Sequence, residues 1–177
     1  MNSKFLSLIL RHQPDKIGVT LDSQGWVLIE VLLEALNKNG HAINAKELDE
    51  IVAQDNKQRY AFDNTHTLIR ANQGHSIAID LDLPPSTPPE ILYHGTSKKT
   101  VESIKQEGIS KQGRQHVHLS SNHATATQVG GRHGKPEVLE VKALKMSEEG
   151  FLFYLSENNV WLTDHVPAQF IVFPNRL

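Results

Sequence analysis

The sequence predicts an α+β fold arranged in two lobes. Apolar residues recur at helical spacing in the first half of the chain, whereas short strand-like runs dominate the second half. A proline-rich stretch at 82–89 separates the halves and holds four of the eight prolines. Because so many prolines exclude a helix or a central strand, we expect a stiff, extended linker there. The predicted lobes are residues 1–81 and 90–177.

The first lobe is expected to begin with three helices. Ser3 can cap a first helix that Pro14 ends, and a short strand is expected at 19–21. Apolar residues at helical spacing predict a second helix over 29–37. Asn44 opens a pattern that resembles a capping box, so a third helix is expected to start there.

A β-hairpin is predicted to follow the helices. The runs 59–63 and 67–70 flank the polar turn Asn64-Thr65-His66. Three helices followed by a two-stranded ribbon indicate a winged-helix unit.

The second lobe is expected to contain many short strands and two helices. The predicted helices cover 98–107, ended by Gly108, and 124–129. The predicted strands are 91–94, 116–119, 138–141, 151–154, 160–162 and 170–173.

Composition excludes several classes of function. The net charge is −2, so no overall basic field attracts nucleic acid and any such site must be local. The chain has no cysteine, which excludes disulfides, thiolate nucleophiles and cysteine zinc sites. The apolar run 5–10 is too short to cross a membrane, and Arg11 interrupts it. We therefore expect a cytoplasmic protein without a membrane partner.

Four polar stretches interrupt apolar surroundings and are candidate sites. They are Arg11-His12, 70–76, 93–97 and 130–136. Arginine can bind a phosphate through two hydrogen bonds and stays charged, and histidine can move a proton near neutral pH. Such residues, without a carboxylate cluster or cysteines, indicate phosphate handling by direct cation contact.

Each stretch also has a simpler explanation. Basic residues in the last turn of a helix complement its dipole, and Arg70 alone suits a surface strand. The glycine-rich run 130–134 suits a flexible loop and matches neither the P-loop nor the dinucleotide fingerprint. His116 and His118 share a strand face, but no third ligand is evident, so no metal site is predicted.

Taken together, the stretches resemble the RNA 2′-phosphotransferase family of the KptA type over nearly the whole chain. The matching motifs are Ser3-Lys4-Phe5-Leu6-Ser7, Leu10-Arg11-His12, Gly25-Trp26, Ile69-Arg70-Ala71-Asn72-Gln73-Gly74-His75-Ser76, Leu92-Tyr93-His94-Gly95-Thr96, Val117-His118-Leu119-Ser120, Arg132-His133-Gly134 and Val160-Trp161-Leu162-Thr163. The order and spacing of these motifs, rather than any one of them, make the resemblance specific.

The resemblance implies a winged-helix-like RNA lobe joined to an NAD-binding lobe of the ADP-ribosyltransferase type. It implies an enzyme that removes an internal 2′-phosphate from RNA, a mark left by certain tRNA splicing ligations, and transfers it to NAD. The transfer is expected to pass through an ADP-ribosylated 2′-phosphate and a transesterification. The implied products are 2′-hydroxyl RNA, nicotinamide and ADP-ribose 1″,2″-cyclic phosphate. The expected partners are 2′-phosphorylated RNA and the co-substrate NAD, and a monomer is expected.

The family's functional residues can be carried over by position. Its catalytic set falls on Arg11, His12, Arg70 and Arg132. Its NAD motifs fall on His94, Gly95, Thr96, His118, Leu119 and Ser120. Asn159 replaces the glycine that the family usually has before Val-Trp-Leu, and because Asn tolerates positive φ, the turn is expected to survive.

Two other functions are compatible with the sequence. One is an ADP-ribosyltransferase that modifies other terminal phosphates of RNA or DNA. The other is a nucleic-acid-binding regulator that senses NAD without turnover. Protein modification is disfavoured because no E-x-E or Q-x-E motif of the arginine-specific enzymes is found.

Overall fold

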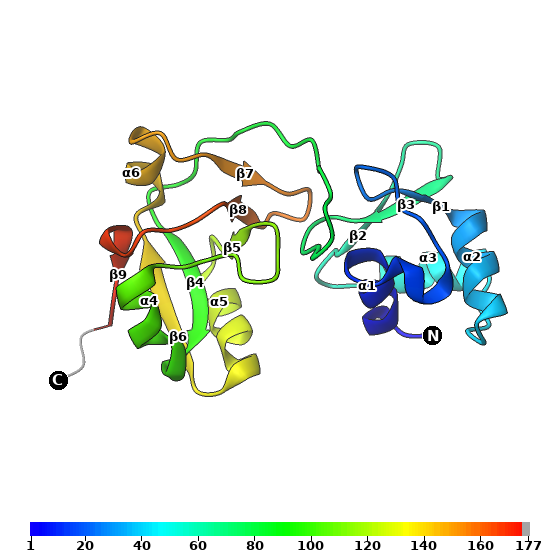
Figure 1. The fold of residues 1–177 in the computed structure, drawn as a ribbon, viewed down its shortest axis with the longest axis horizontal. Coiled ribbons are helices and arrows are strands. Elements are labelled where there is room, and N and C mark those ends of the chain that lie inside the picture. The colour runs from blue at the N-terminus through cyan, green and yellow to red at the C-terminus, as the bar shows by residue number, and fades with distance from the viewer. Residues whose placement is uncertain (175–177) are drawn as a thin grey trace. The chain divides into compact units, whose positions relative to one another are not determined.

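The structure is a computed structural model that describes residues 1–174, apart from the side chain of His133. The fold is α+β, with three small antiparallel sheets of three strands each (Figure 1). The chain divides into two compact units, Met1–Asp82 and Leu83–Leu177. The last three residues of the predicted lobe 90–177 lie outside the described part. In the described part, no helix is both long and apolar enough to cross a membrane.

The first unit packs three helices and a small sheet around one apolar core. The sheet has the strand order β1-β3-β2. The core residues from all these elements include Leu6, Ile9, Leu10, Leu32, Leu36, Leu48 and Ile69, each fully buried. The elements are α1 (Ser3–Arg11), the 3-10 turn η1 (Pro14–Ile17), β1 (Val27–Leu28), α2 (Ile29–Lys38), α3 (Ala45–Ala53), β2 (Tyr60–Phe62) and β3 (Leu68–Ala71).

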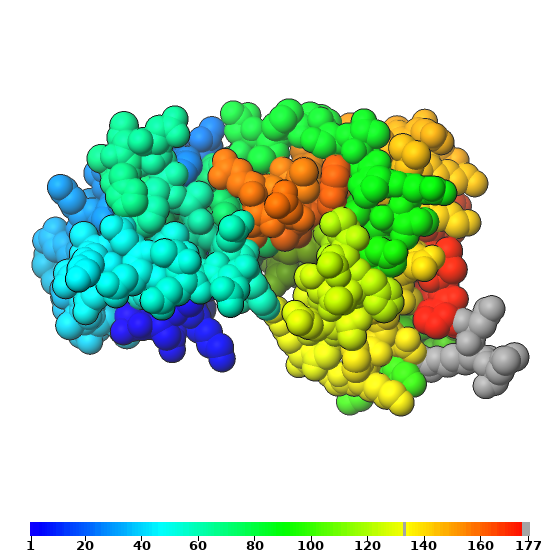
Figure 2. Space-filling view, turned by 180° about the vertical axis from the view of Figure 1, so that it is seen from behind, coloured from blue at the N-terminus to red at the C-terminus, as the bar shows by residue number. Residues whose placement is uncertain are grey.

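Helix α3 lies on the surface of this unit, where the cyan segment shows in the space-filling view (Figure 2). Its predicted capping box is confirmed: the Asn44 side chain accepts from the Glu47 N–H, and the Glu47 carboxylate accepts from the Asn44 N–H.

The predicted hairpin is confirmed as well, since Ala61 pairs with Arg70 in the antiparallel β2–β3 ladder. The sheet therefore holds Arg70 in a fixed register.

Two local predictions in the first unit are wrong. Asn2, not Ser3, caps α1 by accepting from the Phe5 N–H, and the Ser3 hydroxyl lies 3.0 Å from that of Tyr60. No strand forms at 19–21, because Val19 and Leu21 pack into the core from a loop. Their alternation reflects that packing rather than a sheet.

The second unit contains two small sheets joined by a bridge. The sheets have the strand orders β4-β6-β9 and β5-β8-β7. Tyr93 and Ser120 exchange two backbone hydrogen bonds, of 2.7 and 2.9 Å, which tie β4 to the end of β5. The elements are β4 (Leu92–Ser97), η2 (Lys98–Thr100), α4 (Val101–Glu107), β5 (Val117–Leu119), α5 (His123–Gly130), η3 (Gly131–His133), β6 (Pro136–Val141), α6 (Ala143–Glu148), β7 (Phe153–Leu155), β8 (Trp161–Thr163), η4 (Ala168–Phe170) and β9 (Ile171–Val172).

The predicted helices and strands of this half all occur, with shifted ends. Helix α6 was not expected, because its six residues, 143–148, are too few to show a helical period. Asn159 has a φ of 64°, so asparagine holds the left-handed turn as expected. The proline-rich segment 82–89 forms no helix; Pro85 makes an isolated bridge to Tyr154, and the Ser86 N–H donates to the Phe153 carbonyl at 2.8 Å.

Candidate functional site

The end of α1 carries Arg11 and His12. Arg11 is the last helical residue, and only 9% of its surface is exposed. His12 caps the helix, and its N–H donates to the Leu8 carbonyl at 3.0 Å. Both side chains thus extend from the C-terminal end of α1. This is the negative end of the helix dipole, where cationic groups are stabilised.

Arg70 reaches the same unit's interior from β3. Its side chain is 7% exposed, and its guanidinium carbon lies 4.5 Å above the ring of Trp26. Its Nη1 donates a long hydrogen bond of 3.4 Å to the Gln24 carbonyl. The indole face attracts a cation and shields it from water, so Trp26 forms a platform for this guanidinium.

The segment Gly74-His75-Ser76 wraps the end of α1. The Ser76 N–H donates to the Arg11 carbonyl at 3.0 Å, and the Ser76 hydroxyl lies 2.8 Å from His12 Nδ1. Gly74 has a φ of 89°, and a Cβ there would lie 3.3 Å from Cζ and Nε of Arg11. Glycine adopts this backbone conformation without strain, whereas a side chain at this position would be strained and would push the guanidinium aside.

His75 is a buried, neutral histidine beside these cations. It is 1% exposed, and neither ring nitrogen has a hydrogen-bond partner in the structure. Burial, followed by the charges of Arg11, Arg70 and the protonated form of His12, lowers its pKa to about 4. The imidazole therefore adds no further positive charge near neutral pH.

Arg11, His12 and Arg70 are thus brought together in one unit. Arg11 and Arg70 are both largely buried, and both add to the lowering of the pKa of His75 that its burial causes. A guanidinium can bind a phosphate through two parallel hydrogen bonds. The arrangement suits an anion-binding site with a histidine at its edge.

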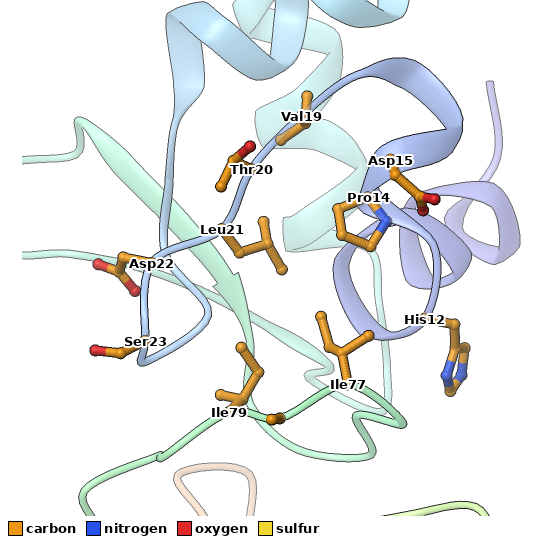
Figure 3. A pocket seen from close by; sticks show the side chains of 11 residues that line it. His12, Pro14, Asp15, Val19, Thr20, Leu21, Asp22, Ser23, Ile77 and Ile79 are labelled. Carbon is orange, nitrogen blue, oxygen red and sulfur yellow. The ribbon is translucent and has the colours of Figure 1, made fainter.

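An open depression lies beside His12 (Figure 3). Leu21, Ile77 and Ile79 point toward one another across its floor, and Asp22 and Ser23 lie at the rim. The floor is apolar, and His12 is the residue of the predicted catalytic set that lines this depression.

In the second unit, the two predicted NAD motifs lie on neighbouring strands. His94, Gly95 and Thr96 are on β4, while His118 and Leu119 are on β5, followed by Ser120. Nδ1 of His94 lies 3.4 Å from the carbonyl oxygen of His118. Burial lowers the pKa of His94, and the bond to that carbonyl partly offsets the effect. The structure therefore brings these two motifs together.

The six residues of these motifs have different surroundings. Leu119 is 2% exposed and packs in the core, so only its backbone can face a ligand. Gly95 lies against α5, where a Cβ would come within 1.8 Å of the Ala126 carbonyl oxygen. The hydroxyls of Thr96 and Thr100 are hydrogen-bonded to each other.

Arg114 is a residue that sequence reasoning missed. Its Nη1 lies 3.3 Å from Nδ1 of His118. Arg114 lies in the turn before β5, outside the motifs of the family resemblance. Its contact with His118 is therefore visible only in the structure. Ser76 stands within a motif of the family resemblance, but nothing in the sequence indicates its contact with His12.

Arg132 lies in the second unit, apart in sequence from the other three predicted catalytic residues. It is exposed and belongs to the 3-10 turn η3 that follows α5. The segment of α5 and η3, yellow-green to yellow, is seen at the surface of this unit (Figure 2). That Arg132 joins Arg11, His12 and Arg70 in one pocket stays a prediction.

These features define a two-unit α+β protein with a buried arginine pair suited to a phosphate. Residues 1–165 match the family described as "RNA 2'-phosphotransferase, Tpt1 / KptA family", so the chain belongs to that family.

Three curated relatives illustrate the similarity, and each is called "Probable RNA 2'-phosphotransferase". The relative from Acaryochloris marina is 51% identical over 96% of this chain and 94% of its own length. Those from Flavobacterium johnsoniae and Fusobacterium nucleatum are both 52% identical, over 97% and 96% of this chain and 94% and 96% of theirs. The similarity therefore spans both units.

Proposed function

We propose that this protein removes an internal 2′-phosphate from RNA by transferring it to NAD. The observation that carries the proposal is the gathering of Arg11, His12 and Arg70 in the first unit of a chain that belongs to the RNA 2′-phosphotransferase family. We further propose that the first unit is a winged-helix-like RNA lobe and the second an NAD-binding lobe of the ADP-ribosyltransferase type. The expected setting is a cytoplasmic monomer acting on tRNA-like substrates.

The residues of the second unit suit a dinucleotide. His94, Thr96 and His118 are half-buried polar side chains on adjoining strands, and Arg114 lies next to His118. Amide, ribose hydroxyl and pyrophosphate groups all need such donors and acceptors. Bound NAD supplies a ribose carbon activated by a cationic ring that leaves as neutral nicotinamide.

The first step is an attack of the RNA 2′-phosphate on that ribose carbon. The phosphate is already an anion, so it needs no base, and positioning dominates the rate. We assign this positioning to Arg11 and Arg70, with Arg132 as a third contact. Arginines suit the site because a 2′-phosphate beside a phosphodiester concentrates negative charge.

The second step is an attack of the ribose 2″-hydroxyl on the transferred phosphorus, which expels the RNA 2′-oxygen. Negative charge grows on phosphorus in this step, so fixed guanidinium groups stabilise the transition state more than the ground state. We assign proton transfer in this step to His12. Such general acid–base assistance typically accelerates a reaction by about 10²–10⁴-fold.

The test compares three RNA oligonucleotides with NAD: one with an internal 2′-phosphate, one without it, and one with only a 5′-monophosphate. We expect nicotinamide and 2′-hydroxyl RNA in equal amounts, from the first oligonucleotide alone. A stable ADP-ribose on the 5′-phosphate RNA would instead indicate a transferase for terminal phosphates. RNA binding without nicotinamide release from any oligonucleotide would indicate a regulator.

A further inference from the structure

Ser76 is fixed to the end of α1 by two separate hydrogen bonds. Its N–H donates to the Arg11 carbonyl at 3.0 Å, and its Oγ lies 2.8 Å from His12 Nδ1. The first bond sets the backbone of Ser76, and the second joins its side chain to the neighbouring residue. The hydroxyl is therefore held beside one particular nitrogen of the His12 ring.

The residues before Ser76 restrict its position further. Gly74 packs against the Arg11 guanidinium with a φ of 89°, and His75 is buried at 1% exposure. Ser76 itself is exposed, so the hydrogen of its hydroxyl can point to solvent while its oxygen accepts from His12. Such a partner is neutral, unlike the carboxylate that orients histidine in many hydrolases.

We propose that Ser76 is a positioning residue that accepts a hydrogen bond from Nδ1–H of His12 and thereby gives Nε2 the lone pair for the proton transfer. The inference rests on the proposed function, because it concerns the second step. Neither the family match nor the relatives' descriptions assign Ser76 a task.

In that step, Nε2 takes the proton of the ribose 2″-hydroxyl as its oxygen bonds to phosphorus. The bond between phosphorus and the RNA 2′-oxygen breaks, and its electron pair stays on that oxygen. Nε2 of the imidazolium then gives the proton to the departing oxygen. Nδ1–H stays bonded to Ser76 throughout, so one nitrogen serves as base and then as acid, and no other reactant is needed.

The first experiment measures the tautomer of His12 by ¹⁵N NMR of histidine-labelled protein, without RNA or NAD. We expect Nδ1–H in the wild type and in Ser76→Thr, which keeps the hydroxyl. Ser76→Ala is expected to shift the ring toward Nε2–H. His12→Gln identifies the His12 signals, and Ser7→Ala makes the same change on α1 while leaving the pair intact.

The second experiment follows both chemical steps in a single turnover. Loss of orientation is expected to slow release of 2′-hydroxyl RNA by about tenfold in Ser76→Ala. Nicotinamide release is expected to change less than about twofold, because the first step needs no base. RNA carrying ADP-ribose on its 2′-phosphate should then accumulate, and Ser76→Thr should restore the second step. A general loss of structure would slow both steps together.

The outcomes separate the inference from the proposed function. If Ser76→Ala leaves the His12 ring signals unchanged, or leaves the second step at the wild-type rate, the inference is overturned. If the wild type does not act on 2′-phosphorylated RNA, the proposed function is overturned. The role of Ser76 in the second step is then overturned too. The tautomer measurement still reports in that case whether Ser76 sets the protonation of His12.

Discussion

The guanidinium of Arg70 lies over the indole of Trp26, with its central carbon 4.5 Å from the ring centroid. Trp26 follows a turn in which the Asp22 carboxylate accepts from the N–H groups of Gln24 and Trp26, both at 2.9 Å. The turn therefore fixes the indole, and the indole supports the arginine. Arg70 is oriented by a residue distant from it in sequence.

Trp26→Leu is expected to weaken binding of 2′-phosphorylated RNA by about 5- to 30-fold, the range of a cation–π contact of about 1–2 kcal/mol. Trp26→Phe keeps a ring face and should lose less. Fluorescence anisotropy with labelled RNA measures both affinities. Equal affinities of the wild type and Trp26→Leu would show that the platform does not serve binding.

Gly74→Ala is expected to reduce turnover by about 10- to 100-fold, because the added Cβ displaces the Arg11 guanidinium. Gly40→Ala is the matched control, since Gly40 has a φ of 83° and a Cβ there meets nothing within 4 Å. Both variants carry a backbone strain of about 1–2 kcal/mol. Thermal melting should therefore show similar losses, whereas steady-state kinetics should show a large loss for Gly74→Ala alone. Similar turnover in the two variants would contradict the role given to Gly74.

The stability of the first unit is expected to fall as the pH is lowered from 6.5 toward 4. The pKa of His75 is lowered to about 4 in the folded chain from 6.5, so the unfolded chain binds the extra proton in this range. Above this range, His75 does not reduce the free energy of unfolding. Near the lower end of the range, its titration lowers that free energy by about 3 kcal/mol. Denaturant unfolding at several pH values measures the loss.

His75→Gln is the control for that measurement, because it removes the titrating ring and keeps a polar side chain. Its stability should depend less steeply on pH than that of the wild type. Parallel curves for the two proteins would mean that His75 is not the group responsible.

Gly95→Ala is expected to unfold the second unit or to destabilise it severely. The new Cβ would overlap the Ala126 carbonyl oxygen at 1.8 Å and approach the Gly130 nitrogen at 2.9 Å, and backbone atoms cannot yield cheaply. Gly131→Ala adds the same methyl group where nothing lies within 4 Å and should melt like the wild type. Circular dichroism melting compares them, and a native-like melt of Gly95→Ala would refute the close packing of β4 on α5.

The sequence alone predicted the features that depend on local pattern. The capping box at Asn44 and the hairpin containing Arg70 depend on residues close together in the sequence. Such local patterns form the same structure in most proteins. The loop at 19–21 was misjudged because Val19 and Leu21 alternate like a strand, and only the assembled core shows why they are apolar. Local alternation cannot distinguish a strand from a loop that packs two side chains inward.

Contacts between segments that are distant in the sequence could not be predicted from the sequence. The spacing of Trp26 and Arg70, or of His12 and Ser76, carries no signal for the contacts they make. The neutral state of His75 likewise arises from burial beside cations that come from other elements. The resemblance predicts which residues belong to the site, and the structure shows the contacts that those of the first unit make.

The most direct test of the phosphate transfer follows the phosphorus atom itself. An RNA oligonucleotide carrying ³²P only in its internal 2′-phosphate is incubated with the protein and NAD, and the products are separated by chromatography. We expect the label to leave the RNA and to appear in ADP-ribose 1″,2″-cyclic phosphate, with one nicotinamide released for each phosphate. Label released as inorganic phosphate, or retained on the RNA while nicotinamide is released, would contradict transfer to NAD.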